Sequence, residues 1–460
     1  MGEVWPMPQV SSGRRTAMSK CPVRFARSMA VAALAMPVLL PGPNAASASP
    51  REAASTTWGV VPVHSTAVYG GLSSPTTSVT TGNMTCVSKS FCVLAGYGTT
   101  SGFINNKQVN HYQPLLWSWN GHAWSDVPNP VPGAGVLKTG VVLGKVSATL
   151  SGSAVLLGTA CSSTTSCWAV GANLTGAAAA VIEHWDGRSW TSSKPDPASG
   201  AWLNAVACAS ENECFAVGSE GAAVGGTNAS SSILVEEWDG TKWSLLVSGQ
   251  KPSPALAAWL DSVTCLSATK CLALGDWYNA AGDDHFVAED YGPSSGQPAA
   301  RWSPVLLSDT SGYKVMNGTG PYGISCLSTT DCLGVGNGAP YGTYSGAYFP
   351  AGVVLHWDGS SWTKLSTPKY YNQPYELNGV ACAPGGCWVA LRASGPVSPA
   401  STPLALAHWA GPGSAFEVVT MPEHGFLGSV SCLPDGSWCM TFGQKVQGTS
   451  TQLIALREAS

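Results

Sequence analysis

The sequence predicts an all-β protein made of repeated four-stranded units. The first observation is the composition: the 460 residues include 53 Gly and 32 Pro but only 10% charged residues. Such a chain favours short strands and tight turns over amphipathic helices, which need charged outer faces. The second observation is a pair of cysteines that recurs along the chain, and the third is a Trp-Asp-Gly or Trp-Asn-Gly turn after most pairs.

The first 48 residues differ from the rest and are typical of a secretory signal peptide. Basic residues precede the apolar run Met29–Leu40, and Ala46-Ser47-Ala48 offers a cleavage site of small residues. The run is short for a membrane span. We therefore predict a signal peptide at 1–48, a single domain at 49–460, and a secreted protein that is extracellular or associated with the cell envelope. A buried or anchored N-terminal helix is the alternative, and Met18 is an alternative start.

Loss of this segment changes both the charge and the cysteine count. It leaves 17 basic and 25 acidic residues, a net charge of −8, with no Lys/Arg cluster. Nucleic acid and anionic membrane are therefore excluded as expected partners. Cys21 is lost as well, so 14 of the 15 cysteines remain. An even number is what complete disulfide pairing of an exported chain requires.

The remaining cysteines form seven closely spaced pairs, which are Cys86/Cys92, Cys161/Cys167, Cys208/Cys214, Cys265/Cys271, Cys326/Cys332, Cys382/Cys387 and Cys432/Cys439. In an antiparallel hairpin, residues six apart can face each other across a short turn, close enough for a disulfide. Metal or redox pairs are the alternative, but metal sites usually use closer spacings with added histidines. The histidines do not follow these pairs, so we interpret each pair as a structural disulfide of a first hairpin.

A third apolar run follows each pair, and in most copies a turn joins it to a fourth, as in IEHWDGRSW, VEEWDGTKW and WSWNGHAW. Asp-Gly and Asn-Gly supply the positive φ angles that tight hairpin turns need. A two-residue turn would place Trp185 and Trp190 on one sheet face and a three-residue turn on opposite faces; both remain open. Four-stranded units of this size cannot bury both faces alone and must stack. Radial stacking gives a β-propeller, which hides the sheet edges.

The two ends of the chain favour closure of a ring. The last copy ends in QLIALREAS without a Trp turn, and STTWGVVPV, with Trp58 and Pro62, has the pattern of a separate fourth strand. The fold prediction is therefore a seven-bladed β-propeller, closed by pairing of the N-terminal strand with the C-terminal blade. An open or six-bladed arrangement and another all-β fold are the alternatives. The irregular segment Val131–Ser153 is interpreted as an inserted hairpin.

The consensus S-C-x-S-x3-C-x-A-V-G followed by W-[DN]-G-x2-W spans roughly residues 57–460. It is similar to a repeat of secreted actinobacterial β-propeller proteins. The resemblance implies a propeller fold and export but no activity, since such proteins mostly lack an assigned one. The turns also resemble the Asp-box of sialidase-like propellers, but here Asp and Gly are adjacent, so no sialidase function is implied. The fourth copy, EDYGPSSGQPAARW, and the sixth, HWAGPGSAF, depart from the turn pattern.

Two groups of ionisable residues are candidate sites. The first precedes the third-strand Trp or its equivalent, and we expect it to edge the blades: His184, Glu237, Asp290, His356 and His408. The second is AGDDHFVAED, interpreted as solvated loop charge, with cation binding or acid–base catalysis as alternatives: Asp283, Asp284, His285, Glu289 and Asp290.

A sialidase-type hydrolase would need several arginines around a central channel to hold a carboxylate. Only five arginines follow the predicted signal peptide, and Arg188, Arg301 and Arg457 fall on turns or outer strands of the predicted blades. The chain has no nucleophile elbow, HExxH, Walker or dinucleotide motif. We therefore predict no catalytic residue, no metal site and no cofactor.

The remaining candidates lie in the long second-to-third and fourth-to-first connections, which emerge on one face of a propeller. They are rich in aromatic residues, Gly and Asn, and the predicted binding residues are Tyr97, Trp277, Tyr278, Tyr341, Tyr344, Tyr348, Tyr370, Tyr371 and Tyr375. Aromatic platforms with amide donors suit uncharged polar ligands, and tyrosines suit protein interfaces. The alternative is that these rings cover the ends of the core.

The functional prediction is a secreted, non-enzymatic propeller that binds an extracellular glycan or protein through this face. The first alternative is an extracellular hydrolase or lyase of glycosidase type, with its site at the mouth of the central channel. Two ionisable side chains converging there would favour the enzyme, as glycosidase carboxylate pairs do. A purely structural envelope protein is the third possibility.

Overall fold

The computed structural model describes residues 57–65, 77–104, 107–130, 154–174, 179–195, 200–221, 231–280, 284–294, 297–307, 313–314, 321–340, 351–369, 375–393, 401–447 and 450–458. The predicted signal peptide at 1–48 and the segment Val131–Ser153 lie outside these residues. The described residues form 29 β-strands and no α-helix. None of them therefore belongs to a helix that could span a membrane.

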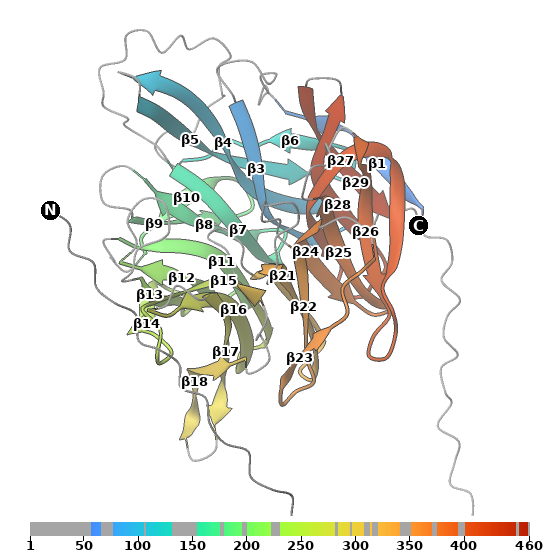
Figure 1. The fold of residues 1–460 in the computed structure, drawn as a ribbon. Coiled ribbons are helices and arrows are strands. Elements are labelled where there is room, and N and C mark those ends of the chain that lie inside the picture. The colour runs from blue at the N-terminus through green and yellow to red at the C-terminus, as the bar shows by residue number, and fades with distance from the viewer. Residues whose placement is uncertain are drawn as a thin grey trace, which may run out of the picture. The chain divides into compact units, whose positions relative to one another are not determined.

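The strands pair in four-stranded antiparallel units (Figure 1). The first unit is β3 (Thr77–Ser88), β4 (Phe91–Ile104), β5 (Lys107–Trp119) and β6 (Trp124–Asp126). The next is β7 (Ala154–Ser163), β8 (Ser166–Asn173), β9 (Ala179–Trp185) and β10 (Trp190–Ser193). It is followed by β11 (Trp202–Ser210), β12 (Glu213–Glu220), β13 (Ser232–Trp238) and β14 (Trp243–Gln250).

The second half of the chain repeats this order. One unit is β15 (Ala257–Ser267), β16 (Lys270–Tyr278), β17 (Asp284–Ser294) and β18 (Gln297–Leu306). In the next, β21 (Asp331–Pro340) pairs with β20 (Pro321–Ser328), β22 (Ala351–Trp357) and the short β19 (Tyr313–Lys314), and β22 pairs with β23 (Trp362–Leu365). The fourth copy departs from the turn pattern but keeps its strand pair, because Tyr291 of β17 faces Trp302 of β18.

The last sheet has seven strands. It contains β24 (Tyr375–Ala383), β25 (Gly386–Ala393), β26 (Pro403–Trp409), β27 (Glu417–Cys432), β28 (Cys439–Gln447), β29 (Ser450–Glu458) and β1 (Trp58–Val61). The long β27 pairs with β26 through its first half and with β28 through its second, so two four-stranded arrangements share it. The prediction of an all-β propeller fold with four-stranded blades is confirmed.

The N-terminal segment joins the last sheet to the first. Strand β1 pairs antiparallel with β29, which is the pairing that the sequence predicted. The next strand, β2 (Val63–His64), runs parallel to β6 at the edge of the first unit. Between them, the carbonyl of Pro62 accepts a hydrogen bond from the backbone of Trp124 at 3.0 Å. A segment of about nine residues is therefore shared by sheets from opposite ends of the chain.

The first hairpin of each unit is closed by a disulfide, so the prediction of seven structural disulfides is confirmed. The bonded pairs are Cys86–Cys92, Cys161–Cys167, Cys208–Cys214, Cys265–Cys271, Cys326–Cys332, Cys382–Cys387 and Cys432–Cys439. The paired cysteines face each other across the hairpin, and one extra residue bulges between Cys161 and Ser163. The Ser163 hydroxyl accepts a hydrogen bond from the backbone N–H of Thr165 at 3.3 Å. This contact explains the consensus Ser that lies two positions after the first cysteine.

The buried position of the cysteines agrees with the structural role predicted for them. The second cysteine of every pair is buried, with at most 3% of its surface exposed: Cys92, Cys167, Cys214, Cys271, Cys332, Cys387 and Cys439. The reason is that this residue lies at the start of the second strand, with its sulfur in a core cluster. Cys214, for example, shares a cluster with Trp168 of the preceding unit. These residues therefore hold the hairpins together from within the core.

The structure shows on which sheet face the two tryptophans of a Trp turn lie, which the sequence left open. Trp185 and Trp190 are direct cross-strand partners on the same face, and the loop between them has four residues rather than two or three. Asp186 Oδ1 accepts hydrogen bonds from the backbone N–H groups of Arg188 and Ser189, both at 2.8 Å. These bonds lower the pKa of the exposed Asp186 carboxyl. Gly187 takes the positive φ of 89° that the turn requires.

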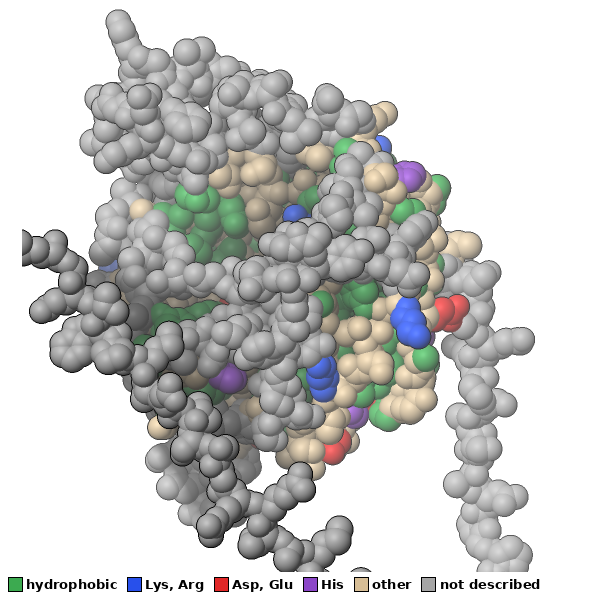
Figure 2. All heavy atoms as spheres, viewed as in Figure 1, with side chains coloured by type: hydrophobic (Ala, Val, Ile, Leu, Met, Phe, Trp, Pro, Cys, Tyr) green, Lys and Arg blue, Asp and Glu red, His purple; other side chains and the backbone are tan. Residues whose placement is uncertain are grey.

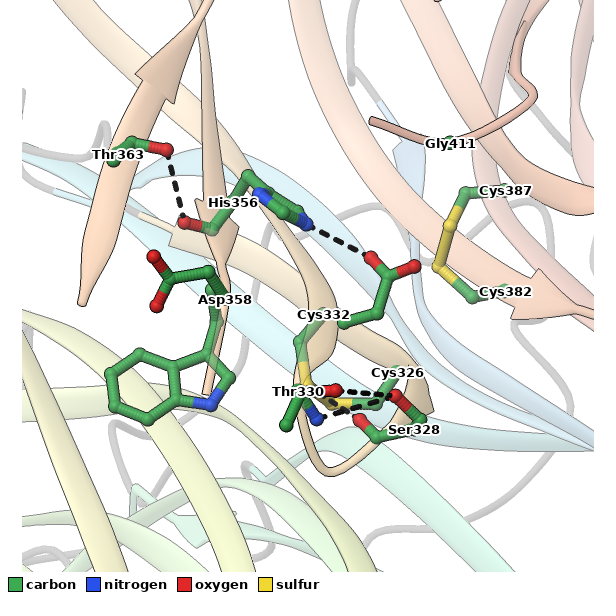
Figure 3. A network of polar contacts seen from close by, with 12 residues as sticks. Cys326, Ser328, Thr330, Cys332, His356, Asp358, Thr363, Cys382, Cys387 and Gly411 are labelled. Carbon is green, nitrogen blue, oxygen red and sulfur yellow. Dashed lines mark hydrogen bonds and ion pairs between the residues drawn. A yellow bond between two sulfur atoms is a disulfide. The ribbon is translucent and has the colours of Figure 1, made fainter. Parts of the chain in front are cut away.

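The Trp turn docks on the disulfide hairpin of its own unit. The indole of Trp185 donates to the carbonyl of Thr164 at 3.1 Å, and Trp357 donates to Thr329 at the same distance. Figure 3 shows this end of one unit, with the Cys326–Cys332 disulfide, its turn residues and Asp358 close together. Because the two consensus motifs contact each other, they recur together in the sequence.

Gly359→Ala should destabilise the protein by about 1–2 kcal/mol, because only glycine holds its φ of 93° without strain. A Cβ there would also lie 2.5 Å from Thr330 Cγ2 in the docked hairpin. Denaturant unfolding of the variant measures this loss. Gly59→Ala is the control, because a Cβ at Gly59 meets no atom within 4 Å. Equal stability of the two variants would contradict the docking argument.

The first strand of each unit is the innermost one, because first strands contact one another between units. Strand β7 contacts β3 and β11, β15 contacts β11 and β20, and β24 contacts β20 and β27. Their backbones approach closely: a Cβ on Gly158 would lie 2.8 Å from the Cα of Ala205 on the next inner strand. Apolar side chains fill the seams between units, such as Val170 against Leu234 and Trp243.

Candidate functional site

Two sets of residues on the inner strands hold the side chains most suited to bind a ligand. We define the −6 column as the residues six positions before the first cysteine of each pair, and the −4 column as those four positions before it. Because each inner strand runs toward its disulfide hairpin, both columns lie toward the opposite end. The second-to-third connections leave from that same end. The described −6 residues are Thr80, Val155, Trp202, Trp259, Glu376 and Phe426.

Three of the six described residues of the −6 column are aromatic. Trp202 and Trp259 occupy the same register on adjacent strands, paired with Ser219 and Asp276 of the second strands. Both are half-buried, so each keeps part of its ring exposed. The Trp259 ring also lies 6.0 Å from that of Tyr278 in an edge-to-face contact. These rings form an amphipathic surface of the kind that stacks on a flat apolar face.

The charged members of this region neutralise each other. Arg392 Nε lies 3.6 Å from Glu376 Oε2, and the Arg392 guanidinium lies 4.6 Å from the Phe426 ring. Burial raises the pKa of Glu376, while Arg392 opposes this shift. The region therefore offers hydrogen-bonding groups and rings with little net charge. Among the described residues visible in Figure 2, charged side chains are few and scattered.

The −4 column lies at a β-bulge that recurs in the inner strands, as at Asn204, Asp261 and Asn378. Asn204 Nδ2 donates to the carbonyl of Leu260 on the next inner strand at 2.8 Å. Asn378 Nδ2 donates to the carbonyl of Leu427 at 3.0 Å, which is the same bond between a later pair of inner strands. The bulge thus aims its side chain at the neighbouring inner strand.

Asp261 is the acidic member of the −4 column. Its Oδ1 accepts a hydrogen bond from Asn204 Nδ2 at 3.2 Å, and its Oδ2 is buried. Burial raises the pKa of Asp261 to about 8, and a hydrogen bond from the Trp259 side chain works against this rise. The carboxyl group is therefore mainly neutral at pH 7.

The predicted aromatic residues are only partly described. Tyr341, Tyr344, Tyr348, Tyr370 and Tyr371 lie outside the described residues. Tyr97 is half-buried and lies 5.9 Å from Tyr112, and Tyr278 contacts Trp259 at the −6 column.

Two of the predicted residues are buried. Trp277 stacks on His285 with 4.4 Å between ring centroids, and the Tyr375 hydroxyl donates to the carbonyl of Pro368. These two rings therefore expose little surface for stacking.

The polar residues before the third-strand Trp lie in the seams between units. His184 stacks on Trp168, whose ring contacts Trp238 of the next unit at 4.7 Å. His356 bonds to Asp331 at 2.9 Å and lies 5.3 Å from Trp409 (Figure 3). Lys270 bridges Asp290 to the face of the Trp357 ring, 5.7 Å from its centroid. These contacts place His184, Asp290 and His356 within the seams, on the faces of the blades and not at their edges.

The interpretation of AGDDHFVAED as solvated loop charge is wrong for its described part. Strand β17 begins at Asp284, and Glu289 is buried on it; Asp283 lies outside the described residues. Glu183 and Glu236 are buried at the equivalent positions of β9 and β13. Burial raises the pKa of Glu183 and of Glu289 to about 8. The sequence aligned these three glutamates, but strand alternation alone did not show that their side of the strand faces another unit.

No group of three or more His, Cys, Asp or Glu side chains that could hold a metal ion occurs among the residues that the structure describes. The fourteen cysteines of the repeat are all in disulfides.

Sequence reasoning missed the −6 and −4 columns, although a fixed spacing from the cysteines marks them. Counting six back gives Trp202, Trp259 and Phe426, and counting four back gives Asn204 and Asp261. Length and composition instead favour the connections between strands as candidate sites. A bulge shifts the inner strand by one residue at this point, so simple alternation does not show which residues share a face.

These features define a β-propeller with four-stranded, disulfide-closed blades. No family model and no curated protein matches the chain. Among solved structures, it is similar to polysaccharide lyase Uly1, with a TM-score of 0.48 and 10% identity over 82% of this chain and 90% of that one. It is also similar to YCF48 from Cyanidioschyzon merolae, with a TM-score of 0.45 and 10% identity over 87% and 98% of the two chains. A third is the Cps50 (Swd1) β-propeller domain of Myceliophteria thermophila, with a TM-score of 0.43 and 10% identity over 83% and 100%. At such identities the likeness concerns the fold alone.

Proposed function

We propose that the protein is an exported, non-enzymatic, seven-bladed propeller that binds an uncharged glycan at the −6 column. The observation that carries the proposal is the pair of half-exposed rings, Trp202 and Trp259, at one register on adjacent inner strands. Aromatic rings stack on the apolar faces of sugars, and neighbouring amide groups bond their hydroxyls. A glycan is favoured over a protein because the half-exposed rings are indoles on inner strands rather than tyrosines on a broad outer surface.

The blade number is supported by the order of contacts among inner strands. The order is β3, β7, β11, β15, β20, β24 and β27, and β27 contacts β3 again. The pairing of β1 with β29 gives the last unit its fourth strand. Each of the seven disulfides then belongs to the first hairpin of one blade.

Export is supported by the cysteines and by the sequence of the first 48 residues. Disulfides persist in oxidising compartments and are rare in reducing ones. Seven disulfides that use every cysteine of the repeat suit an extracellular or envelope-associated protein.

Binding without catalysis is supported by the engagement of both acids in the two columns. A glycosidase-type hydrolase, one form of the alternative, needs one carboxyl group to donate a proton and a second, ionised one to attack or to activate water. Glu376 is paired with Arg392, and Asp261 accepts a bond from Asn204. Neither acid is therefore placed as a free nucleophile.

The test is a screen of neutral and uronic-acid-containing polysaccharides by affinity electrophoresis and calorimetry. Trp202→Ala and Trp259→Ala should each weaken binding of a neutral polymer by about tenfold, the loss of one stacking contact. Phe91→Ala is the control, because this half-buried ring lies beside the disulfide hairpin. Unfolding curves of each variant separate lost binding from lost structure.

Three results would contradict the proposed site, the lack of catalysis or the glycan ligand, respectively. Binding that survives both Trp variants but is lost in Tyr344→Ala, Tyr348→Ala or Tyr371→Ala would move the site to the connections. Release of reducing ends from a bound polymer would favour the hydrolase. Absence of binding to every polysaccharide would overturn the glycan proposal.

A further inference from the structure

The −4 column joins neighbouring inner strands by a repeated side-chain bond. Asn204 on β11 donates to the carbonyl of Leu260 on β15, and Asn378 on β24 donates to the carbonyl of Leu427 on β27. In both cases the accepting residue lies five positions before the first cysteine of its own repeat. The bond therefore recurs at equivalent positions of two repeats.

Asp261 occupies the same position on β15. It lies at the equivalent bulge, between the paired residues Leu260 and Ser262. Strand β15 contacts β20, whose residue five positions before the cysteine is Pro321, just ahead of the bulge between Pro321 and Gly323. Pro321 thus holds the position that accepts the bond from Asn204 or Asn378 in the other repeats. An Asn at position 261 would therefore donate to the carbonyl of Pro321.

We infer that Asp261 is held in its protonated form and donates a hydrogen bond from Oδ2 to the carbonyl of Pro321. An ionised carboxylate has no proton to donate, whereas the neutral acid presents one donor and one acceptor, as an Asn amide does. Asp261 then performs the same joining role as Asn204 and Asn378. It does so only while it is protonated.

The contacts of Asp261 fit this role. Oδ1 already accepts from Asn204 Nδ2, and Oδ2 is buried with no hydrogen bond of normal geometry, although the Trp259 side chain interacts with the carboxyl and opposes the rise of its pKa. A buried carboxylate oxygen without a donor is costly, but a buried hydroxyl that faces a carbonyl is not. Burial also raises the pKa of the group to about 8, so the neutral form predominates at pH 7.

The strands that contact β15 are β11, β12, β13, β16 and β20, and they carry few charged groups at the level of Asp261. Asp276 of β16 lies at this level, paired with Trp259, and a second acid there favours the neutral form of Asp261. Glu220 and Tyr278 lie at the same end of their strands, and Glu236 faces the opposite seam. The remaining groups lie near the disulfide end and are Glu213, Glu237 and Lys270.

The experiment compares unfolding constants of the full chain and three variants from pH 5 to 9. Relative to Asp261→Asn, the wild-type protein should lose stability roughly tenfold per pH unit up to pH 8 and then no further. Asp261→Leu, which keeps the branching at Cγ but has no donor, should be less stable than the wild type at pH 5. Asn378→Asp should acquire a new loss of stability as pH rises from 5. In ¹³C spectra, the Asp261 carboxyl should titrate near pH 8.

Two results would overturn the inference. A ratio between the wild type and Asp261→Asn that is constant with pH would mean that the carboxyl is ionised in the folded protein. Asp261→Leu as stable as Asp261→Asn at pH 5 would mean that the acid is buried without a carbonyl partner, whatever its protonation.

Discussion

At pH 8, Glu289→Gln should be more stable to unfolding than the wild type by about 4 kcal/mol, and the difference should nearly vanish at pH 4.5. Glu289 is buried on β17, and neither of its carboxyl oxygens accepts a hydrogen bond. Val287 and Tyr291, two residues away on the same face, pack against Phe215 and Val235 of the neighbouring unit. The Glu289 carboxyl therefore lies in an apolar seam where its charged form is poorly solvated.

The direction follows from the pKa of Glu289, which burial raises from 4.5 to about 8. The folded protein then binds one proton more than the unfolded chain between these pH values, so the wild type loses stability as pH rises from 4.5 to 8. Gln has no proton to lose, and its variant should show a flatter profile. Chemical denaturation at several pH values measures both.

Glu183→Gln should behave in the same way as Glu289→Gln, because burial raises the pKa of Glu183 to about 8 as well. Its effect should be somewhat smaller, since Ser192 Oγ lies 3.5 Å from one carboxyl oxygen. Glu211→Gln is the matched control on an exposed hairpin. If Glu289→Gln and Glu211→Gln gave the same pH profile, water would have to solvate the Glu289 carboxyl in the seam, and the prediction would be wrong.

Features that depend on local spacing could be predicted from the sequence. The cysteine pairs and the glycines of the Trp turns repeat at fixed distances, and their chemistry allows few alternatives. The same holds for the N-terminal strand: Trp58 and Pro62 reproduce the fourth-strand pattern that the last repeat lacks, and β1 pairs with β29. Local rules suffice because each feature involves one hairpin or one strand pair.

Features that depend on contacts between units could not be predicted in this way. Glu289 reads as surface charge because Asp283, Asp284 and Asp290 surround it in the sequence, yet its side of β17 faces another unit. The inner-strand bulges have a similar effect, because an inserted residue changes which side chain meets the neighbouring strand. The importance of the position four residues before the cysteine follows from the bonds that Asn204 and Asn378 make to the next inner strand, which the sequence does not reveal.

Removal of residues 57–65 should lower the free energy of unfolding by about 4–6 kcal/mol. Strand β1 covers the edge of β29, with Val61 buried in the core and the Trp58 ring 5.4 Å from Trp388 in an edge-to-face contact. Strand β2 leaves with it, and so does the bond in which the Ser65 hydroxyl donates to Asp126 at 2.7 Å. Loss of these contacts would remove the strand that joins the last sheet to the first, and only packing such as that of β27 on β3 would remain.

Point variants on β1 test whether packing, and not chain length, is responsible. Trp58→Ala should account for about 2–3 kcal/mol of the loss, less than a fully buried Trp because the ring is half-exposed. Val60→Ala on the same strand should change stability by less than about 0.5 kcal/mol, since Val60 is 53% exposed. Denaturant unfolding, fitted with one denaturant slope for all variants, measures the loss in free energy of unfolding for the truncation, for Trp58→Ala and for Val60→Ala. Equal effects of Trp58→Ala and Val60→Ala would mean that β1 does not seal the last sheet, and the ring would then have to close by the inner strands alone.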